Sequence, residues 1–256
     1  MRRTGDVTKD YIVNAALPHH GDSYTVIPHA DVINKVTRAI TENGFKIERE
    51  LYRCNTDAQI ANGIYHIKSE LDDEMGMMFA WVNSYNKMRK FRCAVGSYVT
   101  VCMNGMISGD LSTYGRKHTG DADVEYNQVI KDQLNQMSHY HKSLVRDKNM
   151  MKNIPVTKRK QAELLGRMYI EEGIITPTQL TTIKSEIEKP SYDYNAPEDS
   201  IWNLYNHVTH AVKETHPYKW IDTQRAVHNF FTAEYSSYMR PAFIDSVLEQ
   251  HGYFEL

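Results

Sequence analysis

The hydrophobic period of the sequence changes near residue 110, and this change limits the fold more than any other feature. Between residues 45 and 104, apolar residues alternate or run continuously in short segments that polar turns separate, as in "MMFAWVNSY" and "FRCAVGSYVTVCMN". Such segments predict antiparallel strands. After residue 122, apolar residues recur every three or four positions, which predicts helices. We therefore expect an α+β fold, with one helix and an antiparallel β-meander in the N-terminal half and a helical C-terminal half.

The turn and cap residues give the expected limits of the elements. A helix is expected to start at Asp31, after a short edge strand, and to stop at 42–44. A glycine within the longest predicted strand, Gly96, predicts a β-bulge. The expected strands are 24–29, 45–54, 63–71, 77–85 and 91–104. The later helices are expected over 122–152 and 154–173, with Thr157 as a cap, and from Thr176, Ser200 and Thr223 onward. We expect an α+β core at 1–153 and a helical region at 154–256 packed on the same core.

The charges are unevenly distributed along the chain. The formal net charge is −2, but residues 84–160 contain 14 Lys and Arg against 6 Asp and Glu, and the remainder contains 16 against 26. A basic middle between acidic ends can offer a positive face to phosphates. The alternative is that these charges lie on separate solvated faces. The 17 tyrosines suit a binding surface, because Tyr combines an apolar ring with a polar tip.

Cysteine usage and hydropathy exclude several classes of protein. The three cysteines, Cys54, Cys93 and Cys102, are odd in number and have no CxxC spacing, which argues against a disulfide scaffold or a zinc ribbon. No apolar run is long enough for a membrane span, and the N-terminal arginines are not followed by the apolar core of a signal peptide. We expect a cytoplasmic protein that does not interact with membranes.

The predicted hairpin at 79–104 is the first candidate nucleic-acid site. Basic residues lie in and after its turn, and aromatic residues share one face of the preceding strand. Single-stranded nucleic acid is often held in this way, with phosphates on cations and bases on rings. The alternative is that the rings pack against the helical half. The candidate residues are Trp81, Tyr85, Lys87, Arg89, Lys90 and Arg92.

Two further basic clusters are candidate phosphate contacts. Arg116, Lys117 and His118 lie between two glycines, in a loop that lacks the P-loop pattern. Lys158, Arg159 and Lys160 lie near a predicted helix start, where cations oppose the helix dipole. Either cluster can equally be an ordinary solvated surface.

The histidines and cysteines give little support for catalysis. His207 and His210 are three residues apart and off the apolar stripe of their helix, and they form a weak metal candidate with His118 and Asp121. There is no HExxH and no GxSxG pattern, and thiols within strands are usually inert. We expect no cofactor and favour a binding protein over an enzyme.

Three segments resemble a family of uncharacterised phage/plasmid-like proteins. The matching residues are Asn83 to Asn86, Val101 to Met106, and His118 to Gly120, and the later "WNLYNHVTHA" is also similar. The chain departs from the family pattern at Asn86 and Met103. The resemblance covers roughly residues 75–215. It implies an origin in a bacteriophage or mobile element, hence a bacterial host cytoplasm, and an α+β core, but no activity.

These observations favour a phage or mobile-element protein that binds nucleic acid, such as a single-strand DNA binding or annealing protein. Likeness to annealing proteins is architectural only. The first alternative is a protein-interaction module that inhibits a host factor, and the second is a metal-dependent hydrolase or nuclease. The chain can also form a homo-oligomer.

Overall fold

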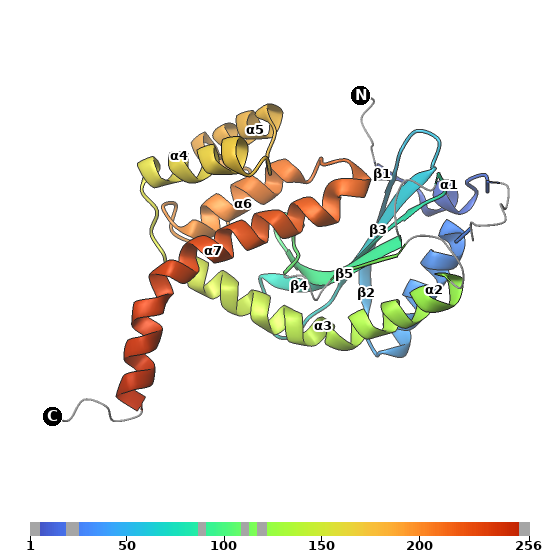
Figure 1. Cartoon of the computed structure of the whole chain (residues 1–256), viewed down its shortest axis with the longest axis horizontal. Helices are drawn as coiled ribbons and strands as arrows, with labels where there is room; N and C mark the ends of the chain where they lie inside the picture. Colours follow the sequence, from blue (N-terminus) through green and yellow to red (C-terminus); the bar gives the residue numbers. More distant parts are fainter. Residues whose placement is uncertain (1–5, 19–25, 87–90, 109–112, 117–121, 251–256) are drawn as a thin grey trace.

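The computed structural model of the chain describes residues 6–18, 26–86, 91–108, 113–116 and 122–250 (Figure 1). The predicted α+β class is confirmed, because strands dominate the first half and helices the second. The strands are β1 (Asp6–Val7), β2 (Ile47–Cys54), β3 (Ile60–Ile67), β4 (Met75–Ser84), β5 (Phe91–Val99), β6 (Asn104–Met106) and β7 (Thr113–Arg116). The helices are α1 (Lys9–Val13), α2 (His29–Glu42), α3 (Ala122–Lys152), α4 (Lys158–Gly166) with the π-helical turn η1 (Arg167–Glu171), α5 (Pro177–Glu188), α6 (Ile201–Val212) and α7 (Pro217–Gln250).

The strands form one antiparallel meander in the order β1-β2-β3-β4-β5-β6, and β7 pairs with the first residues of β5. The register between β4 and β5 is continuous through Gly96, which pairs with Met78, so the predicted bulge is wrong. Gly96 has a different role. A Cβ atom at this position would lie 2.1 Å from the carbonyl oxygen of Met106, so only glycine lets β6 approach β5 this closely.

Helices cover both faces of this sheet. Every residue of β3 and β4 is buried. On one face the strands pack against α2 and α3, with Tyr65, Phe79, Trp81, Cys93, Val95, Ile33, Val36, Ile130 and Leu134 among the buried residues. On the other face they pack against the start of α7, with Ile64, Met78, Ala80, Tyr98, Trp220 and Ile221. The near-continuous apolar sequence of β4 follows from this double burial, because neither face of the strand meets water.

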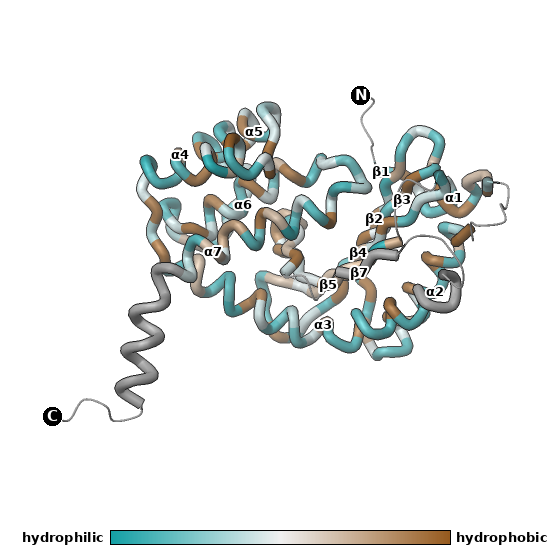
Figure 2. Tube along the Cα trace, viewed as in Figure 1, coloured by the Kyte–Doolittle hydropathy of each residue, from teal (hydrophilic) through white to brown (hydrophobic). Residues whose placement is uncertain are grey.

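Helix α3 links the sheet to the C-terminal helices. It has 31 residues and is therefore about 46 Å long. Its first half places Ile130 and Met137 in the core beneath the sheet, and its second half places Leu144 and Met151 in the core formed with α4 to α7. Hydrophilic and hydrophobic stretches alternate along α3, as expected for a helix with one buried face (Figure 2).

A buried ion cluster fixes α3 to the loop between β3 and β4. Lys148, only 3% exposed, donates to Asp72 at 2.7 and 2.8 Å and to Glu74 at 2.7 Å, and Lys152 donates to Glu74 at 2.6 Å. Burial opposes the ionisation of Glu74, but hydrogen bonds from Lys148, Lys152 and Asn195 outweigh it and lower the pKa of Glu74 to about 2. The two lysines are therefore neutralised within the fold.

The predicted helix starts at Thr157, Thr176 and Ser200 are confirmed, but the start predicted at Asp31 is wrong. Helix α2 begins at His29, after the N-cap Pro28, and residues 26–28 do not form the predicted edge strand. Thr157 and Ser200 are N-caps, and Thr176 forms a capping box with Gln179 before Pro177. The last helix begins at Pro217, not at Thr223, because proline suits the first position of a helix. In the described part of the chain, no helix has both the length and the apolar composition needed to cross a membrane.

The close approach at Gly96 predicts a stability difference between two glycine variants. Gly96→Ala should lower the free energy of unfolding by about 1–3 kcal/mol, since its new methyl group meets backbone. Gly166→Ala is the control: it lies in α4 with open space around it, and should be stabilising by about 0.5–1 kcal/mol. Urea unfolding measures both. Equal stability of the two variants would contradict the close approach.

A buried imidazole predicts that the stability of the fold decreases at acid pH. The Nδ1 atom of His141 lies 2.7 Å from Ser97 Oγ, and burial lowers the pKa of His141 from 6.5 to about 4. The unfolded chain therefore binds this proton first, so stability is full above pH 6.5 and is lost as the pH falls toward 4, by up to about 1.4 kcal/mol per pH unit. His141→Gln should flatten this dependence in urea unfolding, and His139→Gln, exposed on the same helix, should not. Parallel pH profiles of the wild type and His141→Gln would be inconsistent with this role.

Candidate nucleic-acid interface

The aromatic face predicted to stack on bases is buried. Trp81 is 0% exposed and its Nε1 lies 3.4 Å from Tyr65 Oη. Tyr85 is 3% exposed, stacks on the His29 ring at 3.9 Å, and accepts a hydrogen bond from the His29 N–H group at 2.7 Å. Neither ring offers a face to a ligand. The interpretation of Trp81 and Tyr85 as stacking residues is therefore corrected: they are core residues.

The structure places one basic residue of the hairpin, Arg92, near one basic residue of the glycine-flanked loop, Arg116. Arg92 forms a bidentate ion pair with Asp222 of α7, and Arg225 lies 3.7 Å from the same carboxylate. Arg116, described by its backbone, pairs with Phe91. The two chain segments therefore leave the sheet at the same end. The remaining predicted residues, Lys87, Arg89, Lys90, Lys117, His118 and Asp121, lie outside the described residues.

The basic cluster of α4 is separate from Arg92. Lys158 and Arg159 are exposed, and Lys160 pairs with Glu163 at 2.7 Å and with Glu234 at 3.6 Å. The partners of Arg92 and Lys160, Asp222 and Glu234, are twelve residues apart on α7, or about 18 Å along its axis. Arg92 and Lys160 therefore contact α7 at separate places and share no carboxylate partner.

The predicted metal ligands do not form a metal cluster within the described residues. His207 is 5% exposed, so its position off the apolar stripe of α6 does not place it on the surface. The Nε2 atom of His210 lies 3.7 Å from Glu186 Oε1. No group of three or more His, Cys, Asp or Glu side chains suited to a metal ion is present in the part of the chain that the structure describes.

The structure contains an open cleft that was not predicted. It lies between the start of α5, the end of α6 and the start of α7, and has a volume of about 970 Å³. Its ionisable lining consists of His210, Lys213, His216 and Lys219 against one carboxylate, Glu214. Five threonines add hydroxyl groups: Thr176, Thr178, Thr182, Thr215 and Thr223. Cations and hydroxyl donors in this proportion suit an anionic ligand.

Hydrogen bonds fix the walls of the cleft to one another and to the sheet. Gln179 Nε2 donates to Thr215 Oγ1 at 3.1 Å and so joins the start of α5 to the link between α6 and α7. Arg53 of β2 donates from Nη1 to the carbonyl oxygens of Lys213 at 2.7 Å and Thr215 at 3.3 Å. The side chain of Lys213 in turn donates to the carbonyl oxygen of Cys102. The cleft is thus preorganised by the fold.

Aromatic rings alternate with the cations of the cleft. The Lys219 Nζ atom lies 5.9 Å from the centre of the Tyr218 ring, and the His216 ring lies 4.5 Å from the same ring. Beside the cleft, Tyr192 is 37% exposed, with Lys213 Nζ at 5.7 Å from its centre. These rings are more accessible than Trp81 and Tyr85, and each stands beside a cation.

Burial lowers the pKa of two side chains that line the cleft. It lowers the pKa of Lys213, and it lowers the pKa of His210, where the nearby Glu186 carboxylate partly opposes the shift. A partly desolvated cation gains more from an anionic ligand than a solvated one, because less water screens the interaction. Lys213 is such a partly desolvated cation, and its ammonium group also donates to the carbonyl oxygen of Cys102.

The segments that carry the sequence resemblance meet behind this cleft. Asn104 Nδ2 donates to the carbonyl oxygen of Asn206 at 3.1 Å and to its side-chain oxygen at 3.3 Å. Cys102 is 2% exposed, and burial raises the pKa of its thiol to about 11. The strand-end segment thus holds α6 against the sheet, and its cysteine is not set up as a nucleophile.

One sequence signal pointed to the cleft. The stretch "KETHPYKW" from Lys213 to Trp220 interleaves Lys, His and Tyr directly before a helix that starts with proline. Basic and aromatic residues in alternation are a signature of nucleic-acid surfaces. The signal was missed because this stretch was taken as the end of one helix, and because the contribution of α5 depends on tertiary packing.

Comparison with known proteins gives one result. A family model described as a domain of unknown function matches residues 16–232. No curated protein and no solved structure matches the chain.

The burial of all three cysteines predicts unreactive thiols. Cys54, Cys93 and Cys102 are free and buried, and burial raises the pKa of each thiol. Ellman's reagent at mildly alkaline pH should therefore label the folded chain far more slowly than the chain in urea. Rapid labelling of one thiol in the folded state, lost in Cys102→Ser, would contradict this prediction and indicate that Cys102 is reactive.

Proposed function

The chain belongs to the DUF932 family, a domain of unknown function, and we propose that it binds single-stranded nucleic acid in the cleft between α5, α6 and α7. The observation that supports this most strongly is the pairing of lysines with aromatic rings: Lys219 with Tyr218 in the lining of the cleft, and Lys213 with Tyr192 beside it. Phosphates would meet the lysines, and bases would stack on the rings, at about 1–3 kcal/mol per base.

The size and chemistry of the cleft suit a polymer better than a small anion. Its volume of about 970 Å³ is at the upper end of the range for ligand sites, about 300–1,000 Å³. The hydroxyl groups of the five threonines can donate to phosphate oxygens without adding sequence preference. Binding of this kind reads the backbone and the ring faces of bases and is therefore tolerant of sequence.

The cations at the end of the sheet lie near this cleft. Lys219 and Thr223 line the cleft, and Asp222, which holds Arg92 and Arg225, lies between them on the same turn of α7. A strand in the cleft would therefore pass within about one helical turn of Arg92. This arrangement retains part of the original hypothesis and replaces its buried rings with Tyr218 and Tyr192.

The biological setting is also proposed. The resemblance to phage/plasmid-like proteins supports an origin in a bacteriophage or mobile element, and with it a place in the bacterial cytoplasm. Single-stranded DNA is a common intermediate of recombination and replication there. A role in binding or annealing such strands is consistent with binding that does not depend on sequence.

Lys219→Ala should weaken the binding of fluorescein-labelled oligothymidylate, measured by fluorescence anisotropy. Removing one phosphate contact should also reduce the slope of log affinity against log salt by about 1 between about 50 and about 200 mM salt. Lys184→Ala is the matched control, because Lys184 is an exposed lysine of α5 that does not line the cleft. Tyr192→Ala tests stacking and should lower affinity with little change of slope.

Two outcomes would contradict the proposal. One is the absence of oligothymidylate binding to the wild-type chain at about 50 mM salt, where phosphate contacts are strongest. The other is an equal loss in Lys219→Ala and Lys184→Ala, which would indicate general charge attraction instead of a site.

A further inference from the structure

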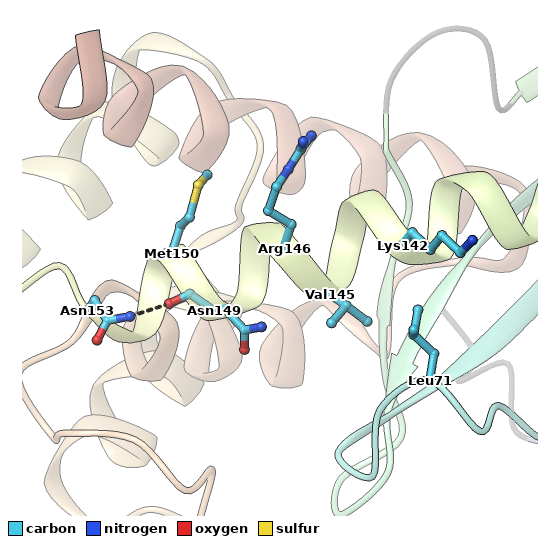
Figure 3. A pocket seen from close by; sticks show the side chains of 7 residues that line it. All are labelled: Leu71, Lys142, Val145, Arg146, Asn149, Met150 and Asn153. Atoms are coloured by element: carbon cyan, nitrogen blue, oxygen red, sulfur yellow. Dashed lines mark hydrogen bonds between the residues drawn. The ribbon is translucent and has the colours of Figure 1, made fainter. Parts of the chain in front are cut away.

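A second, shallower groove runs along the outer surface of α3 (Figure 3). It has a volume of about 380 Å³ and shares no lining residue with the cleft. Leu71, in the loop between β3 and β4, forms one side. The remaining lining comes from α3 and the residue that follows it: Lys142, Val145, Arg146, Asn149, Met150 and Asn153. From Lys142 to Asn153 the groove extends about 16 Å along the helix.

The cations that line this groove differ in ion pairing from the other lysines in the second half of α3. Lys148 and Lys152 are neutralised by Asp72 and Glu74. Lys142 and Arg146 are exposed, and among the described residues neither forms an ion pair; Arg146 only approaches Ser143 Oγ at 3.4 Å. Within the described part of the chain, the groove therefore keeps two positive charges without a carboxylate partner.

The floor of the groove is aliphatic. Leu71 is 50% exposed, and Val145 and Met150 are half-buried. Figure 3 shows Leu71 reaching toward Val145 and Lys142, and Asn153 donating to the carbonyl oxygen of Asn149 at 2.7 Å. None of the described residues that line the groove is aromatic, so these residues offer no ring on which a base could stack. Exposed aliphatic side chains beside unneutralised cations fit a peptide better than a nucleic acid.

We propose that this groove docks an acidic amphipathic helix of another protein. Lys142 and Arg146 are four residues apart, about 6 Å along α3, which matches two carboxylates spaced by one turn on the partner helix. A leucine-sized side chain between those carboxylates would cover Leu71 and Val145, which lie on the same side of α3 (Figure 3). This is helix-in-groove recognition, with the apolar contact providing affinity and the charge pairs providing orientation.

A designed helical peptide tests the proposal without knowledge of the natural partner. The probe is fluorescein-labelled, with two glutamates one turn apart and leucines on the same face, and its control carries glutamine in place of both glutamates. Fluorescence anisotropy should show binding of the glutamate peptide only. Arg146→Ala and Leu71→Ala should each weaken binding at least about fivefold. Arg159→Ala, an exposed cation of α4 outside the groove, should leave binding unchanged.

The same variants separate this groove from the cleft. Arg146→Ala should leave oligothymidylate affinity unchanged, and Lys219→Ala should leave peptide affinity unchanged. Arg146 and Leu71 are exposed, so both variants should keep the unfolding midpoint of the wild type. Failure of the glutamate peptide to bind, equal binding of the glutamine peptide, or an equal loss in Arg159→Ala would overturn the proposal. Loss of oligothymidylate binding in Arg146→Ala would assign the groove to nucleic acid instead.

Discussion

The central strands are covered by helices on both faces, and this double burial determines where a ligand can bind. All side chains of β3 and β4 are buried, by α2 and α3 on one side and by α7 on the other. A meander with one open face could bind a ligand on that face, as in single-strand binding sheets. Here β3 and β4 act as a support, and the cleft and the α3 groove lie instead at the ends and outer surfaces of the helices.

Long-range ion pairs neutralise several cations from the basic middle of the sequence. Arg92 pairs with Asp222, 130 residues away, and Lys148 pairs with Asp72, 76 residues away. Lys152 and Lys160 are likewise matched by Glu74 and Glu234. A count of charges along the chain includes these cations but assigns their partners to other regions. The cations that remain are fewer, and the most useful ones lie outside the counted segment, at Lys213 and Lys219.

The sequence predicted most strands and helices, but it did not predict which of their faces are buried or which elements lie next to one another. Period and caps located β2 to β5 and the helix starts at Thr157, Thr176 and Ser200, because these depend on local chemistry, but they did not separate β6 from β5. The alternation that put Trp81 and Tyr85 on one face was real, but alternation does not tell whether a helix covers that face. The cleft brings Thr176 together with Lys219, and only the packing of α5 on α6 makes them neighbours. Such a site has no local signature beyond the Lys, His and Tyr of 213–219.

Arg53 connects the sheet to the cleft. Its guanidinium group is buried at the edge of β2 and donates to two carbonyl oxygens in the link between α6 and α7. An arginine suits this position because its planar donors can serve several acceptors at once, and burial strengthens each bond. Fixing the backbone at Lys213 and Thr215 places Lys213 and His216 before any ligand arrives. An anion in the proposed site would therefore meet the Lys213 side chain already in place, which would limit the entropy cost of binding.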